Sequence, residues 1–194
     1  MRLTKAFRAV TALVLTAAAI ASLSSCASSV RAEEKMLELR AALLASDEVT
    51  AVANIRADHG ERVFDFKIKY IGGEDGGEIT ILEPESLSGI TARVGGGGAS
   101  IRYDGAELDT GPLGGGLSPA GIIPALISEW KTGFVDMLSE ERLDGRDALA
   151  MTSALTESAE QTTWFDKKTN LPIRAEALTG GRAALTVVFE NVSY

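Results

Sequence analysis

The chain has few of the residues that build covalent cross-links, metal sites or catalytic centres. Its 194 residues include one cysteine and one histidine. A single thiol cannot form an internal disulfide, so stability must come from a hydrophobic core, which a chain of this length can bury. The histidine, His59, lies in an Asp-His-Gly turn, and its neighbours in sequence supply neither the nucleophile nor the metal that a catalytic base works with. We therefore expect no enzyme, no metal site and no cofactor.

Basic residues and long apolar runs are also scarce. Lys and Arg total 19 against 27 Asp and Glu, for a net charge of −8. An acidic protein is a poor ligand for nucleic acid, so we expect no nucleic-acid partner. The apolar run Ala9–Ala21 has 13 residues, shorter than the roughly 20 that a membrane-spanning helix needs.

The N-terminus instead has the pattern of a secretory signal. Arg2, Lys5 and Arg8 precede the apolar run, and small residues follow it. The run leads to Leu23-Ser24-Ser25-Cys26, which resembles the bacterial lipobox. In that class of protein the cysteine thiol takes a diacylglycerol, and cleavage makes this residue the new N-terminus. An ordinary signal peptide with a chance cysteine is the alternative.

The lipobox resemblance divides the chain into three parts. It implies a lipoprotein signal peptide over residues 1–25, a lipidated tether over 26–32 and a single domain over 33–194. Cys26 would then anchor the protein outside the cytoplasm, in the cell membrane or in the outer membrane if the host has one. Two acyl chains hold a protein stably in a bilayer. Loss of the signal would change the net charge to −11.

The domain reads as an α+β fold. Residues 33–46 and 122–133 have apolar side chains at helical spacing, and short strands with polar or glycine-rich turns fill the rest. Residues 62–70 alternate cleanly between apolar and polar. Short connections require antiparallel pairing. We expect about five strands, a loop and helix, and about five more strands, forming a curved antiparallel sheet with both helices on one face.

The C-terminal stretch WFDKKTNLPIRAEALTGGRAALTVVFENV, residues 164–192, resembles a known family. Its motif positions are Trp164, Asp166, Thr169, Leu171, Pro172, Gly181, Phe189 and Asn191. They are similar to the C-terminal signature of the LolA/LolB superfamily of lipoprotein-sorting proteins. The resemblance implies an incomplete β-barrel whose concave apolar face is covered by helices and holds acyl chains. A clostridial spore-germination lipoprotein of similar fold instead binds and supports a cell-wall amidase.

Eight apolar residues are candidates for the lining of a hydrophobic cavity. They are Phe64, Phe66, Ile68, Ile79, Ile81, Trp130, Trp164 and Val187. Periodicity alone does not separate a lined cavity from a packed core, since both need an apolar inner face. The family resemblance favours the cavity.

Two functions follow as expectations. The first is a membrane-anchored lipoprotein that holds a lipid or an acylated protein by burying its apolar chains. The second is a non-catalytic lipoprotein that binds and supports another protein of the cell envelope, such as a cell-wall amidase. The two differ in whether the concave face has room for a ligand.

Overall fold

The computed structural model describes residues 30–73, 76–95, 98–110 and 117–194. Cys26, the signal peptide and most of the tether lie outside these residues. Within these described residues, eleven strands form one antiparallel sheet. The first group comprises β1 (Val49–Asp58), β2 (Val63–Gly73), β3 (Gly76–Glu83), β4 (Thr91–Gly95), β5 (Gly98–Tyr103) and β6 (Ala106–Asp109). The second comprises β7 (Met137–Leu143), β8 (Arg146–Thr156), β9 (Ala159–Asp166), β10 (Pro172–Thr179) and β11 (Arg182–Ser193).

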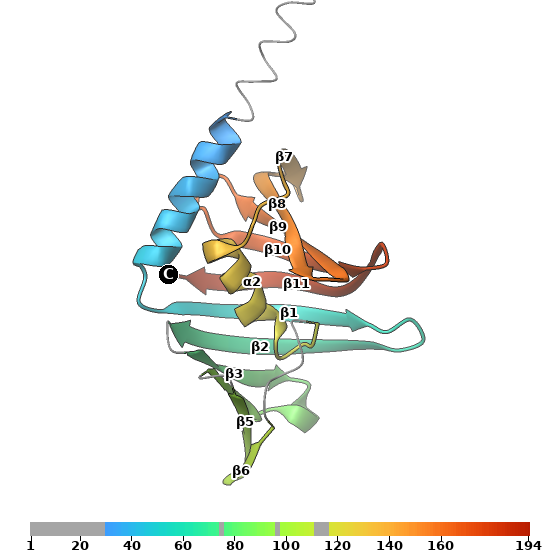
Figure 1. Cartoon of the computed structure of the whole chain (residues 1–194). Coiled ribbons are helices and arrows are strands. Elements are labelled where there is room, and N and C mark those ends of the chain that lie inside the picture. The colour runs from blue at the N-terminus through green and yellow to red at the C-terminus, as the bar shows by residue number, and fades with distance from the viewer. Residues whose placement is uncertain (1–29, 74–75, 96–97, 111–116) are drawn as a thin grey trace, which may run out of the picture.

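The sheet consists of two meanders, β1–β6 and β7–β11, which pair with each other through β1 and β11. Its strand order is β6-β5-β4-β3-β2-β1-β11-β10-β9-β8-β7. The central pairing therefore joins β1 to β11, the first and last strands of the chain, and β6 and β7 form the two edges. The sheet curves into a half-barrel whose edges do not meet (Figure 1). This is the predicted α+β fold with an incomplete barrel.

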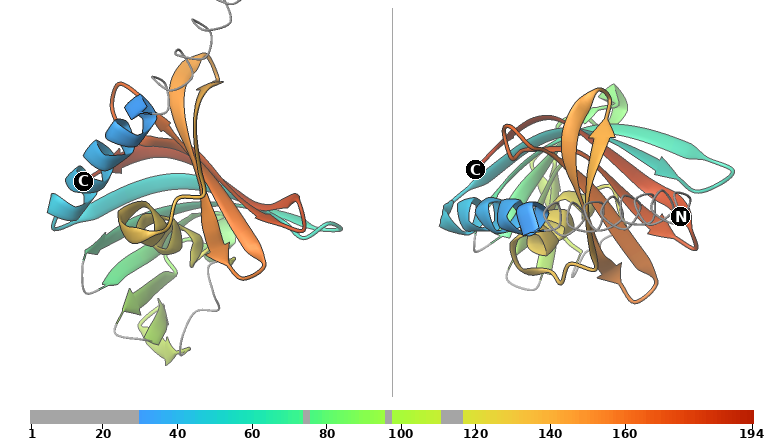
Figure 2. Two further views of the ribbon diagram at one scale, coloured as in Figure 1. Left: turned by 45° about the horizontal axis from the view of Figure 1, so that its top comes forward. Right: turned by 90° about the horizontal axis from the view of Figure 1, so that it is seen from above.

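The chain between β6 and β7 must pass from one edge of the sheet to the other, and the second helix belongs to this connection. α2 (Ile122–Thr132) lies over the concave face with the strands curving around it (Figure 2). Its apolar positions are buried, namely Ile122, Ile123, Leu126, Ile127 and Trp130. A short 3-10 helix, η1 (Glu85–Leu87), connects β3 to β4 and was not expected from the sequence.

A helix also covers residues 30–45, and we call this segment the N-terminal helix. It runs along one border of the half-barrel, beside the C-terminal end of the chain (Figure 2). Its inner side is buried against the core through Ala32, Met36, Leu39 and Leu43. Both predicted helices therefore exist.

The strand register defines which side chains face inward. In β1 every second residue from Val49 to Ala57 is buried. Paired residues of an antiparallel ladder point to the same face. The pairing of β1 with β2 therefore brings Phe64, Phe66, Ile68 and Tyr70 to the concave face, as the alternation in the sequence predicts.

Candidate functional site

The eight candidate residues take three kinds of position. Ile68, Ile79, Trp130 and Val187 belong to the fully buried core, and Phe66 and Ile81 are half-buried against it. Phe64 is on the concave face near the beginning of β2 but is 45% exposed. Trp164 lies on the opposite, convex face, because its neighbours Thr163 and Phe165 point inward and its indole N–H donates to exposed Glu141 at 2.8 Å. The structure thus does not bring all eight residues together.

The centre of the half-barrel is filled by α2. Trp130 is 1% exposed, and its ring contacts Phe165 and Phe189 edge-on, with centroids at 5.3 and 5.6 Å. Leu126 and Ile123 are buried beside it in the same core. Beneath α2 the inner face is a packed core, so any room for a ligand lies to the side of this helix.

A chain of buried polar groups fastens α2 to the sheet. The Trp130 indole N–H donates to the Thr163 hydroxyl at 3.0 Å, and Thr163 donates to the Gln161 side-chain oxygen at 2.6 Å. The Gln161 amide donates to Ser153 at 2.8 Å, and Ser153 reaches the Glu129 carboxylate at 3.4 Å. Buried polar groups are costly without partners. The chain therefore holds the helix at one position on β8 and β9.

Arg40 links the two helices. Its guanidinium donates to the backbone carbonyls of Trp130, at 3.2 Å, and Gly133. These carbonyls belong to the C-terminal end of α2, where cations are favoured by the helix dipole. Nothing in the sequence around Arg40 marks it for this contact, because its partners lie some 90 residues away.

A groove opens beside α2 on the concave face. It encloses about 690 Å³ between α2, the end of the N-terminal helix and the strands β2, β3 and β4. Its apolar lining comprises Leu44, Tyr70, Val94, Pro124 and Ile127, and its polar lining includes Ser46, Asp47, Ser128, Lys131 and Thr132. The buried residues Tyr70 and Ile127 lie at the bottom, while Leu44, Asp47 and Ser128 are exposed at the rim. The bottom of the groove is therefore apolar, whereas its rim has polar side chains beside the exposed Leu44.

Glycines create the room under this groove. A Cβ atom on Gly77 would lie 2.5 Å from Cε2 of Tyr70, and one on Gly72 would overlap the Tyr70 hydroxyl. The ring thus lies flat over two backbone positions that have no side chains. Burial raises the pKa of the Tyr70 hydroxyl. The sequence signal for this arrangement is the glycine cluster at the β2–β3 turn, which by itself indicates only a turn.

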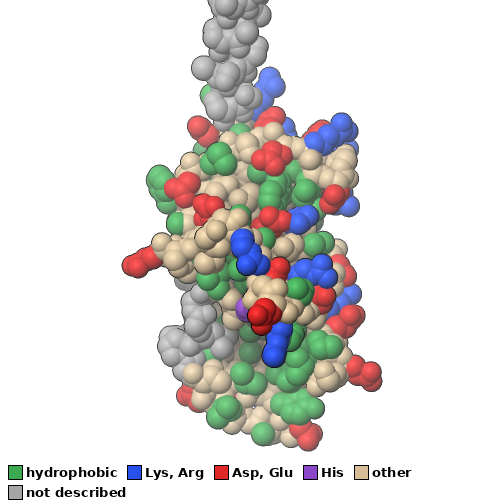
Figure 3. All heavy atoms as spheres, turned by 90° about the vertical axis from the view of Figure 1, so that its right-hand side faces the viewer, with side chains coloured by type: hydrophobic (Ala, Val, Ile, Leu, Met, Phe, Trp, Pro, Cys, Tyr) green, Lys and Arg blue, Asp and Glu red, His purple; other side chains and the backbone are tan. Residues whose placement is uncertain are grey.

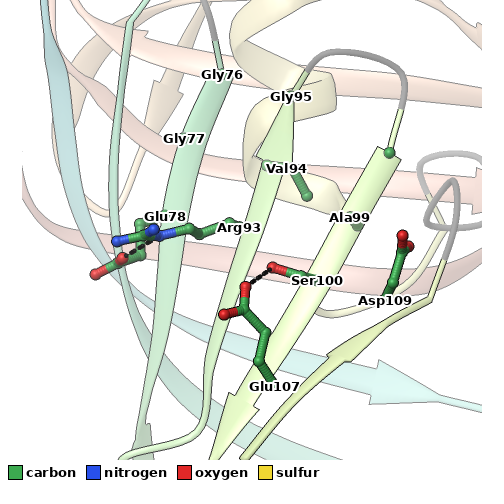
Figure 4. A pocket seen from close by; sticks show the side chains of 11 residues that line it. Gly76, Gly77, Glu78, Arg93, Val94, Gly95, Ala99, Ser100, Glu107 and Asp109 are labelled. Carbon is green, nitrogen blue, oxygen red and sulfur yellow. Dashed lines mark hydrogen bonds and ion pairs between the residues drawn. The ribbon is translucent and has the colours of Figure 1, made fainter.

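A second hollow lies on the convex side of the same strands. It encloses about 840 Å³, and its lining includes the charged residues Glu78, Arg93, Glu107 and Asp109, with α2 behind the strands (Figure 4). Arg93 donates to Glu78 at 3.1 Å, and Ser100 donates to Glu107 at 2.8 Å, which lowers the pKa of the Glu107 carboxyl. Arg93 thus forms an ion pair with Glu78, and Glu107 forms one with Arg102 at 3.3 Å. The concave groove is therefore the better candidate for an apolar ligand.

His59 is an exposed turn residue at the tip of the β1–β2 hairpin. Its ring contacts Phe64 edge-on at 6.1 Å, and its backbone N–H donates to the Arg62 carbonyl at 2.9 Å. Figure 3 views the molecule from the side to which this hairpin points in Figure 1. In the described part of the chain, no group of three or more His, Cys, Asp or Glu side chains could hold a metal ion.

Comparison with solved structures places this fold among known ones. An uncharacterized conserved protein from Thermus thermophilus matches with a TM-score of 0.53 and 13% identity, over 83% of this chain and 86% of that one. A LolA superfamily protein from Nitrosomonas europaea matches with a TM-score of 0.43 and 13% identity, over 84% and 92% of the two chains. The chain shares its overall fold with the Thermus thermophilus protein, and it is similar to the LolA superfamily protein.

A structure of another kind of protein is also similar to this chain. The GerS lipoprotein in complex with the CwlD amidase, from Clostridioides difficile, matches with a TM-score of 0.47 and 14% identity, over 84% of this chain and 95% of that one. No protein-family model and no curated protein matches the sequence. At these identities the likeness concerns the fold alone.

Of the helices described in this chain, none has the length and apolar character to cross a membrane. Cys26 lies outside the described residues, so both the lipobox and its acylation stay predictions.

Proposed function

We propose that this protein is a membrane-anchored extracytoplasmic lipoprotein that holds the acyl chains of a lipid or an acylated protein in the concave groove beside α2. The anchor is the lipid on Cys26. The role that follows is carriage or presentation of the bound lipid, and it involves no catalytic step. The observation that carries the proposal is the groove itself, open beside a core that is otherwise packed.

The size and lining of the groove suit a chain-like amphiphile. Its volume of about 690 Å³ lies within the range of roughly 300–1,000 Å³ that is usual for small-molecule pockets. An acyl chain over Tyr70, Val94 and Ile127 would gain about 0.8 kcal/mol for each buried methylene. The polar end of the lipid would then lie at the rim.

The rim carries a cation that suits an acidic head group. Lys131 is half-buried on α2 and forms no ion pair with any residue that the structure describes. A phosphate or carboxylate placed at the rim would meet its ammonium group. We therefore propose an anionic lipid as the preferred ligand, with Lys131→Met expected to shift preference toward neutral lipids.

The test is native mass spectrometry of the lipoprotein released from membranes into mild detergent, combined with organic extraction of whatever remains bound. We expect one lipid per chain in addition to the covalent anchor. Ser128 lies exposed on the rim, so Ser128→Trp should block the groove without touching the core. Ser158→Trp, in an exposed turn far from the groove, is the matched control.

Loss of the lipid in Ser128→Trp but not in Ser158→Trp would support the proposal. A folded protein that carries no lipid would overturn it and favour the second expectation, a lipoprotein that supports a protein of the cell envelope. Equal lipid content in both variants would place the ligand elsewhere and also contradict it.

A further inference from the structure

The N-terminal helix has a second apolar face that no other part of the described chain covers. Val30 is 53% exposed, Leu37 66% and Leu44 61%. These residues are seven positions apart, and a heptad on a straight helix drifts by only about 20°. They therefore form one line along the helix, which we call the outer stripe.

The outer stripe is on the far side of the helix from the core. The buried residues of the helix, among them Met36, Leu39 and Leu43, point to the sheet. At 100° per residue, Leu39 lies about 200° around the helix from Leu37, so the two faces are opposite. In Figure 2 one side of this helix faces the strands and the other faces away from the molecule. Single exposed leucines are normal, but a line of three is a potential contact surface.

The position of the lipid anchor in the sequence identifies what this surface meets. Cys26 precedes Val30 by four residues, and four residues span at most about 14 Å when fully extended. If the acyl chains on Cys26 are in the bilayer, the start of the helix must be at or very near the membrane surface. This step rests on the anchor proposed above.

Charge does not oppose such a contact. The helix has three acidic residues, Glu33, Glu34 and Glu38, and three basic residues, Arg31, Lys35 and Arg40. It therefore has no net charge, although the domain as a whole is acidic. Contact with a bilayer would depend on apolar burial rather than on anionic lipid.

The far end of the outer stripe reaches the groove. Leu44 belongs to the stripe and also lines the groove beside Ser128 and Lys131. An apolar line thus runs from the anchored end of the helix to the groove rim.

We propose that the outer stripe docks on the membrane that holds the anchor, so that the helix lies along the bilayer surface and the groove opens toward it. The occupant of this surface is the lipid bilayer. Lipid would pass between bilayer and groove beside Leu44 without crossing open water.

The acylated full-length protein in vesicles of phosphatidylcholine tests this arrangement. Because the lone native cysteine would carry the anchor, an introduced cysteine is the single reactive thiol. A fluorescent probe on Ala41→Cys, an exposed position between Leu37 and Leu44, reports on the outer stripe. A probe on Arg142→Cys, exposed on β7, is the control. Nitroxide-bearing lipids in the bilayer serve as the quencher.

We expect several-fold stronger quenching at position 41 than at position 142, and little change with salt. The double variant Leu37→Gln/Leu44→Gln should abolish this difference while the protein stays on the vesicles and keeps its thermal stability. Equal quenching at the two positions of an acylated protein would overturn the docking alone. A probe at position 41 that is shielded from water but not quenched would mean that a protein covers the stripe, and would also overturn it.

The anchor is checked separately by the mass of the intact protein. A chain that lacks the diacylglycerol on Cys26 would overturn the anchor and, with it, the membrane docking. Lipid in the groove of such a chain would leave the ligand part of the proposed function standing.

Discussion

The two halves of the sheet meet α2 in different ways. On the side of β8 and β9 the helix is held by Trp130, by two edge-on aromatic contacts and by a buried chain of hydrogen bonds. On the side of β2, β3 and β4 glycines replace side chains, and a groove of about 690 Å³ remains. One half of the concave face is closed by packing, and the other is left open.

The outer strands continue this difference. Toward the β6 edge the inward-facing row Tyr70, Ile79, Ala92 and Ile101 ends at Leu108, which is largely exposed. In Figure 3 apolar side chains gather on the lower half of the molecule, where these strands lie. The curved sheet extends beyond α2 toward the β6 edge, so the helix covers only part of its concave face. α2 therefore sets the position of the groove, and the glycines of the neighbouring strands make room for it.

The largest expected effect is on the closed half. Trp130→Ala should lower the free energy of unfolding by about 3–5 kcal/mol, because it leaves a cavity between Phe165 and Phe189. Chemical denaturation of the variant measures this loss. Trp164→Ala on the convex face is the control and should cost only a fraction as much. Similar losses for the two tryptophans would contradict the packing described here.

The second largest loss in the free energy of unfolding is expected for the buried chain of polar groups in the closed half. Gln161→Leu keeps the size of the side chain but leaves Ser153 and Thr163 without their partner, at a cost of about 1–3 kcal/mol. Thr162→Val on the convex face of the same strand, whose hydroxyl forms a hydrogen bond with that of Thr152 at 3.0 Å, is the matched control. Urea unfolding of both variants decides the point. A loss for Thr162→Val as large as that for Gln161→Leu would count against a role for the buried chain.

The open half is probed through its glycines. Gly77→Ala places a methyl group against the Tyr70 ring, and such overpacking costs about 1–3 kcal/mol. It should also reduce lipid binding, because the ring would move into the groove. Gly98→Ala has free space around its Cβ and should change stability by less than about 0.5 kcal/mol. Thermal unfolding and lipid content of both variants are the measurements, and equal behaviour would remove the proposed role of Gly77.

The smallest effect concerns pH. Tyr194 donates to the Asn170 carbonyl at 2.7 Å, and burial raises the pKa of its hydroxyl to about 12. Since the pKa of an unfolded tyrosine is about 10, its stabilising contribution is complete below pH 10 and is lost as the pH rises toward 12. Tyr194→Phe should therefore weaken the decline of Tm over this range. The decline should persist in part, because Tyr70 is shifted in the same direction. An unchanged decline would contradict this assignment.

Local pattern was informative where one face of an element is wholly apolar. The alternation of residues 62–70 correctly placed Phe66, Ile68 and Tyr70 on the inner face, and the Gly180-Gly181 turn with positive φ at both glycines closes the predicted final hairpin. The order of helices and strands also followed from such patterns. These features depend on neighbours in sequence, which is why they could be predicted.

Trp164 shows where this reasoning fails. The inner face of β9 carries Gln161, Thr163 and Phe165. Because two of these residues are polar, the pattern of the strand favours the face with Trp164 as the buried one. The polar pair is buried because Trp130 and Ser153, from other elements, supply its partners. No pattern within β9 contains those contacts.

The sequence by itself determined the class of fold, the two helices and the apolar face of the sheet, because each depends on composition or on spacing along one segment, and the anchor at Cys26 stays a prediction. Only the tertiary structure decided that α2 fills the centre, that Arg40 joins the helices and that a groove remains above the glycines of β2 and β3. Those outcomes depend on how far the sheet curves and on which distant side chains meet across it, and packing settles both.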